Sequence, residues 1–545
     1  MMTKMILMIS MTSMLLSLFM LANNIYIITK IPLIKFNQML MSADIMLDWI
    51  SMMFMSTVML ISGLILMFSI YYITKKEQYK FMLMMLLFVL SMGILIISNN
   101  MFLLLLGWDG LGLSSYVLVI YYQNYTSAAS GSITLISNRI GDIMILMAMG
   151  MNMMIMNWSF SMKMEFMYSS MMLLMLAACS KSAQLPFSAW LPMAMAAPTP
   201  ISALVHSSTL VTAGVFISLR MMMNQSNISN IMMIITSLTA IYASMTACWE
   251  NDMKKIIAYS TLSQIAMMMF AISMNAHMLA FLHLIIHALF KSTMFMCAGT
   301  MIHESSYQDM RMMGMNMNML LIPSITLGIT SMALMGAPFS SGFFSKDSII
   351  ENLMMIKLDS LMTIMMIMSI GMTTSYSIRM ISMSNKWLMK SYPNLSNHLN
   401  WQSIIPLIIM SPLSISMGSL MSWIMIPDQM FMLSLQFKMY IISILMLGIL
   451  TGMMLSYKNY NLMKMGLSAI SIWFLHIMSV IPKKILSPSM MIFLKNDKEW
   501  QENYGPYKIH YSNIMMSMNT LNMKKSTTML FMLMTIMIPT MFIMK

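Results

Sequence analysis

The sequence predicts an all-α polytopic membrane protein with about 15–16 transmembrane helices. The first observation is composition: hydrophobic residues make up 59% of the 545 residues and charged residues only 9%. The second is a mean hydropathy of +0.77. Soluble domains usually carry about 25% charged residues. Such a small number of charged residues cannot cover the surface of a soluble protein. A cytosolic enzyme, a disordered tail protein and a nucleic-acid binder are therefore excluded, despite the net charge of +13.

The third observation is a succession of apolar runs of roughly 17–25 residues, the length that crosses a bilayer. Short loops rich in Asn, Ser and Lys separate them, and the basic excess is expected in such loops, for example at Lys75-Lys76 and Lys254-Lys255. The predicted spans are 5–27, 45–73, 81–98, 100–121, 127–156, 167–189, 200–220, 231–248, 255–275, 277–301, 318–337, 340–356, 361–383, 403–424, 439–456 and 526–544. The apolar stretch 465–481 is expected either to span or to lie flat.

One segment near the C-terminus, 483–525, differs in kind because lysines and acids are interleaved there with Met, Ile, Leu and Tyr. This pattern is typical of an amphipathic helix that lies along a membrane surface or a neighbouring subunit. A solvated loop is the alternative. Pro488, Gly505 and Pro506 are expected to interrupt a helix in this segment.

Cysteine and methionine usage bear on cofactors and origin. Cys179, Cys248 and Cys297 are too few and too scattered for a disulfide framework, a zinc site or an iron–sulfur cluster, so no cofactor and no metal are predicted in this chain. The 93 methionines have no explanation in folding, since Met packs where Leu would. An A/T-rich genome that reads an extra codon as Met explains them. Residues 1–27 read as a span without an Arg-rich presequence or signal peptide, so the expected location is the mitochondrial inner membrane.

Ionisable residues inside apolar spans are the candidates for function, because a lone charge in hydrocarbon is costly and such groups face a protein interior or water. Asp109, within Gly107-Trp108-Asp109-Gly110, is central in the run 101–122. The alternative is a carboxylate that pins two helices together. Arg139 and Asp142 on the next span are three residues apart, share a helix face and partly neutralise each other. A structural role for this pair is nearly as well supported as a functional one.

The second candidate is Lys181, at the end of an apolar run and followed by Pro186. Pro186 is expected to break the helix close to the lysine. In a poorly solvated site beside freed carbonyls, the neutral form of the amine becomes accessible, so Lys181 can take up and release protons. His206 lies early in the next span, after Pro198 and Pro200 interrupt the chain.

The third candidate is the stripe formed by His283, His287 and Lys291. Their spacing of four residues places them on one helix face. Two histidines at this spacing could bind a metal, but neither an adjoining Glu nor a third ligand is evident. A proton relay fits a buried stripe of titratable groups better. Structural polar packing is a further alternative.

The fourth candidate is Lys346 with Asp347, after the Pro/Gly-interrupted segment 337–342. Paired interrupted helices in two halves of a chain indicate an inverted-repeat transporter with its ion sites at the breaks. Lys181 and Lys346 are separated by about five spans, so the sequence predicts two broken helices in an inverted five-helix repeat.

The motifs around these residues resemble those of NADH–ubiquinone oxidoreductase chain 5, the antiporter-like subunit family of mitochondrial complex I. The central motif is SKSAQLPFSAWLPMAMAAPTPISALVHSSTLVTAGVF at 180–216. Further motifs, in the expected order, are GWDGLGLSSY at 107–116, NRIGD at 138–142, DMKKIIAYSTLSQ at 252–264, FLHLIIHALFKS at 281–292 and GFFSKD at 342–347. The resemblance covers roughly residues 40–385, and the C-terminal third matches mainly in layout.

The resemblance implies a role for each candidate residue. Asp109 would pair with Lys181, and separation of the pair would gate proton uptake. His206 would lie between Lys181 and the central axis, the stripe of His283, His287 and Lys291 would form the middle of a hydrated relay, and Lys346 beside Asp347 would be the terminal site. Two departures stand out: many family members have Glu where this chain has Asp109, and Met193 occupies a position often held by Asp.

The resemblance also suggests a domain organisation. The predicted regions are N-terminal helices at 1–98, a first antiporter-like half at 99–220, a second at 221–385, additional helices at 386–482, an amphipathic lateral helix at 483–525 and a C-terminal anchor at 526–545.

The implied function is that of a core membrane-arm subunit of proton-pumping NADH:ubiquinone oxidoreductase. FMN, iron–sulfur clusters and the ubiquinone site would then belong to partner subunits, because this chain has no cluster-binding cysteines and no convincing nucleotide loop. The expected partners are membrane lipids and other membrane-arm subunits, among them a chain 4-like neighbour, and no nucleic acid. One alternative is an autonomous cation/proton antiporter, and another is a scaffold with inert buried charges.

Overall fold

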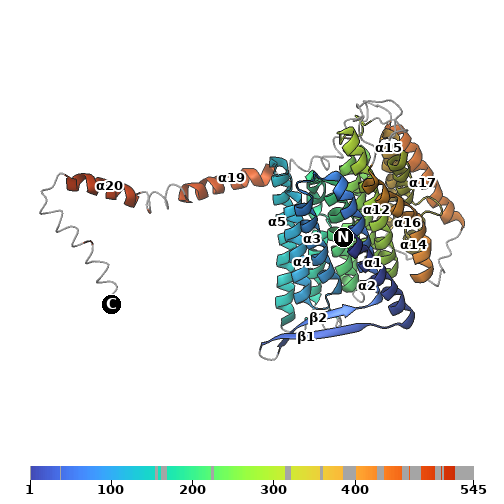
Figure 1. Cartoon of the computed structure of the whole chain (residues 1–545), viewed down its shortest axis with the longest axis horizontal. Helices are drawn as coiled ribbons and strands as arrows, with labels where there is room; N and C mark the ends of the chain where they lie inside the picture. Colours follow the sequence, from blue (N-terminus) through green and yellow to red (C-terminus); the bar gives the residue numbers. More distant parts are fainter. Residues whose placement is uncertain are drawn as a thin grey trace. The chain divides into compact units, whose positions relative to one another are not determined.

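The structure is a computed structural model that describes residues 2–36, 39–153, 158–160, 168–221, 226–313, 321–355, 360–384, 400–425, 435–456, 480–497 and 508–521, with residues 466, 505 and 535. The chain divides into two compact units, Met1–Ile470 and Ser471–Lys545. The first unit is a bundle of long helices (Figure 1). The predicted span 526–544 and most of the stretch 465–481 lie outside the described residues.

Helices account for nearly all of the first unit, and each predicted span up to residue 456 contains at least one of them. The N-terminal helices are α1 (Met2–Asn23), α2 (Trp49–Tyr72), α3 (Gln78–Ile97), α4 (Met101–Val119), α5 (Tyr125–Met153) and α6 (Tyr168–Lys181). Short helical turns follow: η2 (Phe187–Ala189), α7 (Trp190–Met193), η3 (Ala194–Ala196), α8 (Thr199–Ile201) and η4 (Ser202–Thr209). The remaining helices are α9 (Leu210–Met221), α10 (Ser226–Trp249), α11 (Met253–Ser273), α12 (His277–Ser305), α13 (Leu321–Met335), α14 (Ser341–Met355), α15 (Ser360–Ser384), α16 (Trp401–Met425) and α17 (Leu435–Ser456).

Twelve helices among the described residues are long and apolar enough to cross a membrane. This finding confirms the predicted class of an all-α polytopic membrane protein. Fewer full spans are found among the described residues than the 15–16 predicted, because α6, α13 and α14 have only 14, 15 and 15 residues and the predicted span 526–544 lies almost entirely outside the described residues. An α-helix of 15 residues is about 22 Å long, shorter than the hydrocarbon core of about 30 Å.

A β-hairpin, which the sequence did not predict, runs across one end of the bundle (Figure 1). Strands β1 (Ile27–Phe36) and β2 (Met39–Leu47) pair antiparallel, with a register shift between Pro32 and Ile34. The predicted span 45–73 was therefore wrong at its start, since 45–47 belong to β2. The helix begins after Asp48, whose carboxylate accepts from the Ser51 N–H at 2.9 Å while the Asp48 N–H donates to Ser51 Oγ at 3.0 Å. This capping box fixes the start of α2.

The most deeply buried helices define the axis of the bundle. In α11 and in Thr199–Met221, every residue of the 18-residue apolar stretch is buried. The buried share of the corresponding stretch is 94% in α12 but only 11% in α17. A helix enclosed on all sides by other helices can hold polar side chains away from lipid. The candidate residues of α12 lie on this axis.

Two helices end well inside the bundle. The first, α6, ends at Lys181, and the chain then runs through Ala183, whose φ of 55° lies in the left-handed region. The second, α13, ends before Gly336, which has a φ of 81°, and α14 begins at Ser341. An added Cβ at Gly342 would collide with the Ala333 carbonyl, so the close approach of the two half-helices requires glycine there.

In the second unit, the structure describes helices α19 (Val480–Leu494) and α20 (Lys508–Leu521). Pro488 lies inside α19, so the expectation that it interrupts the helix was wrong. Proline removes one helical hydrogen bond but does not always end a helix. Gly505 is in a helical turn, whereas Pro506 lies outside the described residues.

Candidate proton-relay site

The titratable residues predicted inside the spans are almost completely buried. Lys181, His283, His287 and Lys291 have no exposed surface, and His206 and Lys346 are 1% exposed. Asp142 is 8% exposed, whereas Asp109 and Asp347 are partly exposed and Arg139 is exposed. The structure assembles these residues into two clusters with His206 between them in the chain.

The first cluster is built around Trp108 on α4. The Lys181 ammonium donates to the Trp108 carbonyl at 2.8 Å and lies 3.7 Å from the centre of the indole ring. The indole N–H of Trp108 donates to Asp142 Oδ1 at 2.8 Å. One aromatic residue thus joins the amine at the end of α6 to the carboxylate of α5, and the ring face stabilises the cation.

Asp142 also receives Arg139. The Arg139 guanidinium lies 3.0 Å from Asp142 Oδ2, as the three-residue spacing predicted, and 3.9 Å from Asp109 Oδ1. Within the described part of the chain, no carboxylate oxygen lies within 4.0 Å of the Lys181 ammonium. The electrostatic influence of Asp142 on Lys181 exceeds that of Asp109. The expected Asp109–Lys181 pair is therefore not in direct contact, and the shorter Asp side chain is consistent with that.

His206 lies on η4, a π-helical turn that continues into α9. Neither ring nitrogen has a hydrogen-bond partner among the described residues. The Trp190 ring lies 6.1 Å from the imidazole, and the Trp190 N–H donates to the Ser180 carbonyl at 2.9 Å. Trp190 therefore connects His206 to the end of the helix that carries Lys181. Single π-helical turns occur frequently at functional positions.

The second cluster lies between α11, α12 and α14. His283 shares a hydrogen bond of 2.8 Å with Ser345 through Nδ1 and one of 3.2 Å with Gln264 through Nε2. Its ring centre is 6.3 Å from that of His287. Lys291, one turn further along α12, donates to the Ser260 hydroxyl. The stripe predicted from the spacing is thus one buried row of polar groups.

Lys346 completes the second cluster. Its ammonium donates to the Leu334 carbonyl, which the end of α13 leaves free. It follows Ser345, the partner of His283, and lies near enough to His283 and Lys291 for their charges to interact. Neither nitrogen of His287 has a protein partner in the described ranges, so this imidazole can accept or donate without first breaking a hydrogen bond.

Several polar residues of the site were not singled out in the sequence. Ser260, Gln264 and Ser345 bind the candidate amines and imidazoles, and the Tyr376 hydroxyl lies near Ser260, Ser263 and Gln264. A fully buried helix with several hydroxyl and amide side chains, as α11 is, provides the signal that could have found them. Lys254 was expected in a connecting loop, which was wrong, because it lies in the first turn of α11 and is 4% exposed.

A metal at the histidine pair has no support in the described residues, where no three His, Cys, Asp or Glu side chains are grouped as a metal site requires. The stripe instead offers two imidazoles and an amine at successive helix turns, with hydroxyl partners at Ser345 and Ser260. Imidazoles and amines can bind and release protons without a metal ion.

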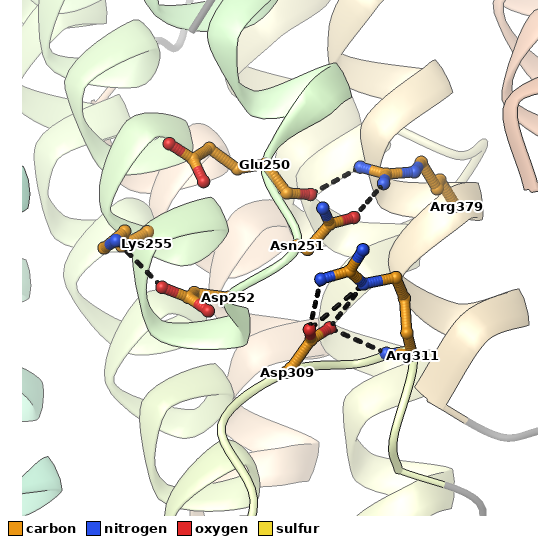
Figure 2. A network of polar contacts seen from close by, with 7 residues as sticks. All are labelled: Glu250, Asn251, Asp252, Lys255, Asp309, Arg311 and Arg379. Atoms are coloured by element: carbon orange, nitrogen blue, oxygen red, sulfur yellow. Dashed lines mark hydrogen bonds and ion pairs between the residues drawn. The ribbon is translucent and has the colours of Figure 1, made fainter. Parts of the chain in front are cut away.

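One end of the bundle carries a separate polar network (Figure 2). Arg379 donates to the carbonyls of Cys248 at 2.8 Å and Glu250 at 2.6 Å, and to Asn251 Oδ1 at 2.7 Å. These bonds satisfy carbonyls at the end of α10. Arg311 binds Asp309 through both carboxylate oxygens. Arg379 thus fastens the turn between α10 and α11 to α15, and main-chain hydrogen bonds of 3.1 Å from the Met253 N–H to the Gln308 carbonyl and from the Met310 N–H to the Asn251 carbonyl fasten it to the chain after α12.

Comparisons with known proteins identify the family of this chain. The family described as NADH:quinone oxidoreductase/Mrp antiporter, TM, matches residues 98–373, and the one described as NADH dehydrogenase subunit 5 C-terminus matches 376–545. The chain is 38% identical over 522 residues to NADH-ubiquinone oxidoreductase chain 5 of Aedes aegypti, covering 91% of this chain and 89% of the relative. For the same protein of Mytilus edulis the identity is 34% over 502 residues, covering 88% of each.

A solved structure of an Mrp complex from a Dietzia species has a similar fold, with a TM-score of 0.73 at 19% identity. The match covers 95% of this chain but only 60% of that one. The family matches span nearly all residues from 98 onward and include both clusters, in agreement with the motifs at 107–116, 180–216 and 342–347. The chain belongs to the NADH-ubiquinone oxidoreductase chain 5 family.

Proposed function

We propose that this chain translocates protons across the mitochondrial inner membrane as a membrane-arm subunit of the proton-pumping NADH:ubiquinone oxidoreductase, complex I. The observation that carries the proposal is the buried row of His283, His287, Lys291 and Lys346. Within it, His283 binds Ser345 and Gln264, and Lys291 binds Ser260. Burying four basic groups together is unfavourable, and such groups inside a membrane usually belong to an ion or proton pathway.

The second cluster can pass a proton because its histidines can accept a proton on one ring nitrogen and donate one from the other. The two nitrogens of His283 bind different partners, so a proton taken up on one side of the ring can leave from the other. Several neighbouring cations repel one another in a medium of low dielectric constant. The row is therefore most stable with few bound protons, and protonation of one residue promotes release of a proton from its neighbour.

The first cluster supplies a control. Lys181 is held by the Trp108 carbonyl and ring, and its charge depends on Asp142 and Asp109. A change in the position or charge of these carboxylates shifts the balance between the protonated and neutral amine. Release from Lys181 then delivers a proton towards the central row through His206. Moving one proton against 100 mV stores about 2.3 kcal/mol, which electrostatic changes at buried sites can supply.

The energy would come from partner subunits. No redox centre is assigned to this chain, so FMN, the iron–sulfur clusters and the ubiquinone site would be theirs. Asp109 and Arg139 retain 36% and 44% side-chain exposure in spans whose neighbouring surface includes Leu106, Leu113 and Ile136. Polar groups at the middle of an apolar face need cover from protein, so we assign this face to a chain 4-like neighbour.

The alternative is an autonomous cation/proton antiporter. The relatives at 34–46% identity are named NADH-ubiquinone oxidoreductase chain 5, which favours the subunit over the antiporter. An antiporter would exchange cations for protons when the purified chain alone is placed in liposomes. The subunit would not, because its driving reaction lies in its partners.

The test is proton pumping by the assembled complex in sealed membrane vesicles, measured per NADH oxidised. Lys291→Met removes the amine at the centre of the row and is expected to reduce this ratio strongly. Lys75→Met, at an exposed lysine between α2 and α3, is the matched control and should pump normally. Normal pumping by Lys291→Met in a fully assembled complex would leave the chain with a scaffold role only.

A further inference from the structure

Lys254 is the buried amine that the relay described above does not use. It is the second residue of α11 and is 4% exposed. Its neighbour Lys255 differs in every respect, with 43% side-chain exposure and an ion pair of 2.8 Å to Asp252. Adjacent residues of one type thus occupy opposite environments, and only Lys255 has the environment usual for a lysine.

The surroundings of Lys254 disfavour a permanent charge. The ammonium donates to one protein group, the Ala197 carbonyl, at 3.2 Å. Within the described ranges, no carboxylate oxygen lies within the 4.0 Å of an ion pair. The positive end of the α11 dipole adds to the cost, because Lys254 lies in the first turn. If Lys254 served only to bind this carbonyl, the buried charge would lower stability without need, since a hydroxyl could make the same hydrogen bond without a charge.

The position of Lys254 connects the end of the bundle to both parts of the relay. Ala197 directly precedes the turns α8 and η4, and η4 carries His206. Further along α11 lies Ser260, the partner of Lys291. Ser260 is six residues from Lys254, or about 9 Å along the helix axis. Lys254 therefore lies between the outer end of α11 and the central row.

Proton-binding groups surround the outer end of α11. Figure 2 shows Glu250, Asp252 and Asp309 at this end. The Met253 N–H donates to the Gln308 carbonyl at 3.1 Å, which brings the chain after α12 against the start of α11. Burial raises the pKa of the Glu250 carboxyl above its ordinary value, with Lys255 opposing this and Asp252 adding to it. The Glu250 carboxyl can therefore hold a proton at this end of the bundle.

We propose that Lys254 is a further proton-carrying residue of the relay, which exchanges protons between the α10–α11 end of the bundle and the interior sites at His206 and Lys291. The proposal rests on the proposed proton translocation by this chain. In the protonated state the ammonium binds the Ala197 carbonyl. After losing one proton inward, the neutral amine retains its hydrogen-bond donors and is reprotonated from the surface, so no other reactant is needed.

The competing explanation is a structural clip in which Lys254 holds the Ala197 carbonyl. Two substitutions separate the explanations. Lys254→Arg keeps the charge and the donor but does not release a proton, because arginine stays protonated in proteins. Lys254→His keeps a titratable group and a donor on a shorter side chain. A clip predicts that Arg preserves function better than His, whereas a proton carrier predicts the reverse.

The experiment uses the assembled complex in sealed vesicles and measures protons pumped per NADH oxidised. NADH oxidation by an artificial electron acceptor and the amount of intact complex report assembly. For Lys254→Arg we expect a fall in pumping of at least about tenfold at unchanged assembly, since a positioned proton-transfer group typically contributes about 10²–10⁴-fold. Lys254→His should retain more pumping than Lys254→Arg. Lys255→Gln is the matched control and should pump as the unmodified chain does.

Three results would overturn the assignment. The first is normal pumping by Lys254→Arg, and the second is better pumping by Lys254→Arg than by Lys254→His. The third is failure of both variants to assemble while Lys255→Gln assembles, a result that would identify Lys254 as a structural clip. A parallel Lys346→Met variant tests the proposed function separately. If Lys346→Met loses pumping while Lys254→Arg does not, only the role of Lys254 fails. If Lys346→Met pumps normally, the proposed function fails.

Discussion

The two helix breaks of the bundle place a lysine in similar backbone surroundings. Lys181 at the end of α6 and Lys346 in the first turns of α14 are both buried, and each donates to a main-chain carbonyl. Residues with a left-handed φ lie beside both, Ala183 in the first break and Gly336 in the second. The carbonyl that binds Lys346 belongs to the last turn of α13, where the helix end leaves it free, whereas the Trp108 carbonyl that binds Lys181 lies within the unbroken helix α4.

The groups around the two lysines differ. Lys181 faces a carboxylate pair through Trp108, and the pair reaches the exposed side of α4 and α5. Lys346 instead faces other basic groups, His283 and Lys291, and its carboxylate neighbour is the adjacent Asp347. On the proposed function, the first break would respond to charge at the subunit surface, and the second would pass protons within the interior.

Removing the amine of the second break should have the largest effect. In Lys346→Met the Leu334 carbonyl and the neighbouring His283 lose the only amine of that break, so pumping per NADH oxidised should fall about tenfold or more. Lys346→Arg keeps the charge but holds its proton, and should fail to a similar degree. Full pumping by the Arg variant would mean that charge alone is needed there, and would remove the distinction between the breaks.

The two carboxylates of the first cluster should contribute unequally. Asp142 accepts from Trp108 and from Arg139, whereas Asp109 lies 3.9 Å from Arg139. Asp142→Asn should therefore reduce pumping about two- to fivefold, corresponding to roughly 0.4–1 kcal/mol, and Asp109→Asn should reduce it less. Pumping rates of both variants in intact complex test this order. A larger effect of Asp109→Asn would instead support Asp109 as the gating carboxylate, as the resemblance implies.

The elements that the sequence predicted best depend on local signals. The apolar runs located the helices, and the spacing of His283, His287 and Lys291 placed them on one face, because both follow directly from helix periodicity. The β-hairpin was missed because most of its residues lie between the predicted spans 5–27 and 45–73, in a stretch that was assigned to a connecting loop. The contacts of Lys181 with Trp108 and of His283 with Ser345 join residues 73 and 62 positions apart, and no local pattern in one sequence encodes such distances.

Burial was also harder to predict than helix position. Lys254 and Lys255 are identical in type and adjacent, so composition placed both in a loop. Only the packing of α11 among its neighbours separates the buried amine from the exposed one. The hydroxyl and amide partners on α11 were missed for the same reason, since Ser and Gln in an apolar span look alike whichever way they face.

The histidines of the second cluster should differ in stability. Replacing His283 by Ala leaves Ser345 and Gln264 without their partner, and the lost hydrogen bonds and uncovered polar groups should destabilise the complex by about 1–3 kcal/mol. His287→Ala removes a ring of the same size with no protein hydrogen bond and should destabilise less. The midpoint of thermal dissociation of the purified complex measures both. Equal shifts would mean that ring packing, rather than the hydrogen bonds of His283, dominates.

The smallest effect is expected outside the membrane, at the Asp309–Arg311 pair. Burial opposes ionisation of Asp309, but the hydrogen bonds and charge of Arg311 outweigh it and lower the pKa of the carboxyl below its ordinary value of 3.8. A lowered pKa in the folded state means that the ionised carboxylate contributes stability above pH 3.8, which is lost as the pH falls through the still lower folded value. With the Arg311 side chain 60% exposed, Asp309→Asn should lower stability at pH 7 by at most about 1 kcal/mol. Salt screens exposed pairs, so the difference between variant and unmodified complex in thermal midpoint should shrink in concentrated salt, whereas the larger differences at His283 should persist. If the loss of stability in Asp309→Asn persisted in concentrated salt, the Asp309–Arg311 pair would be shielded from solvent as the buried sites are.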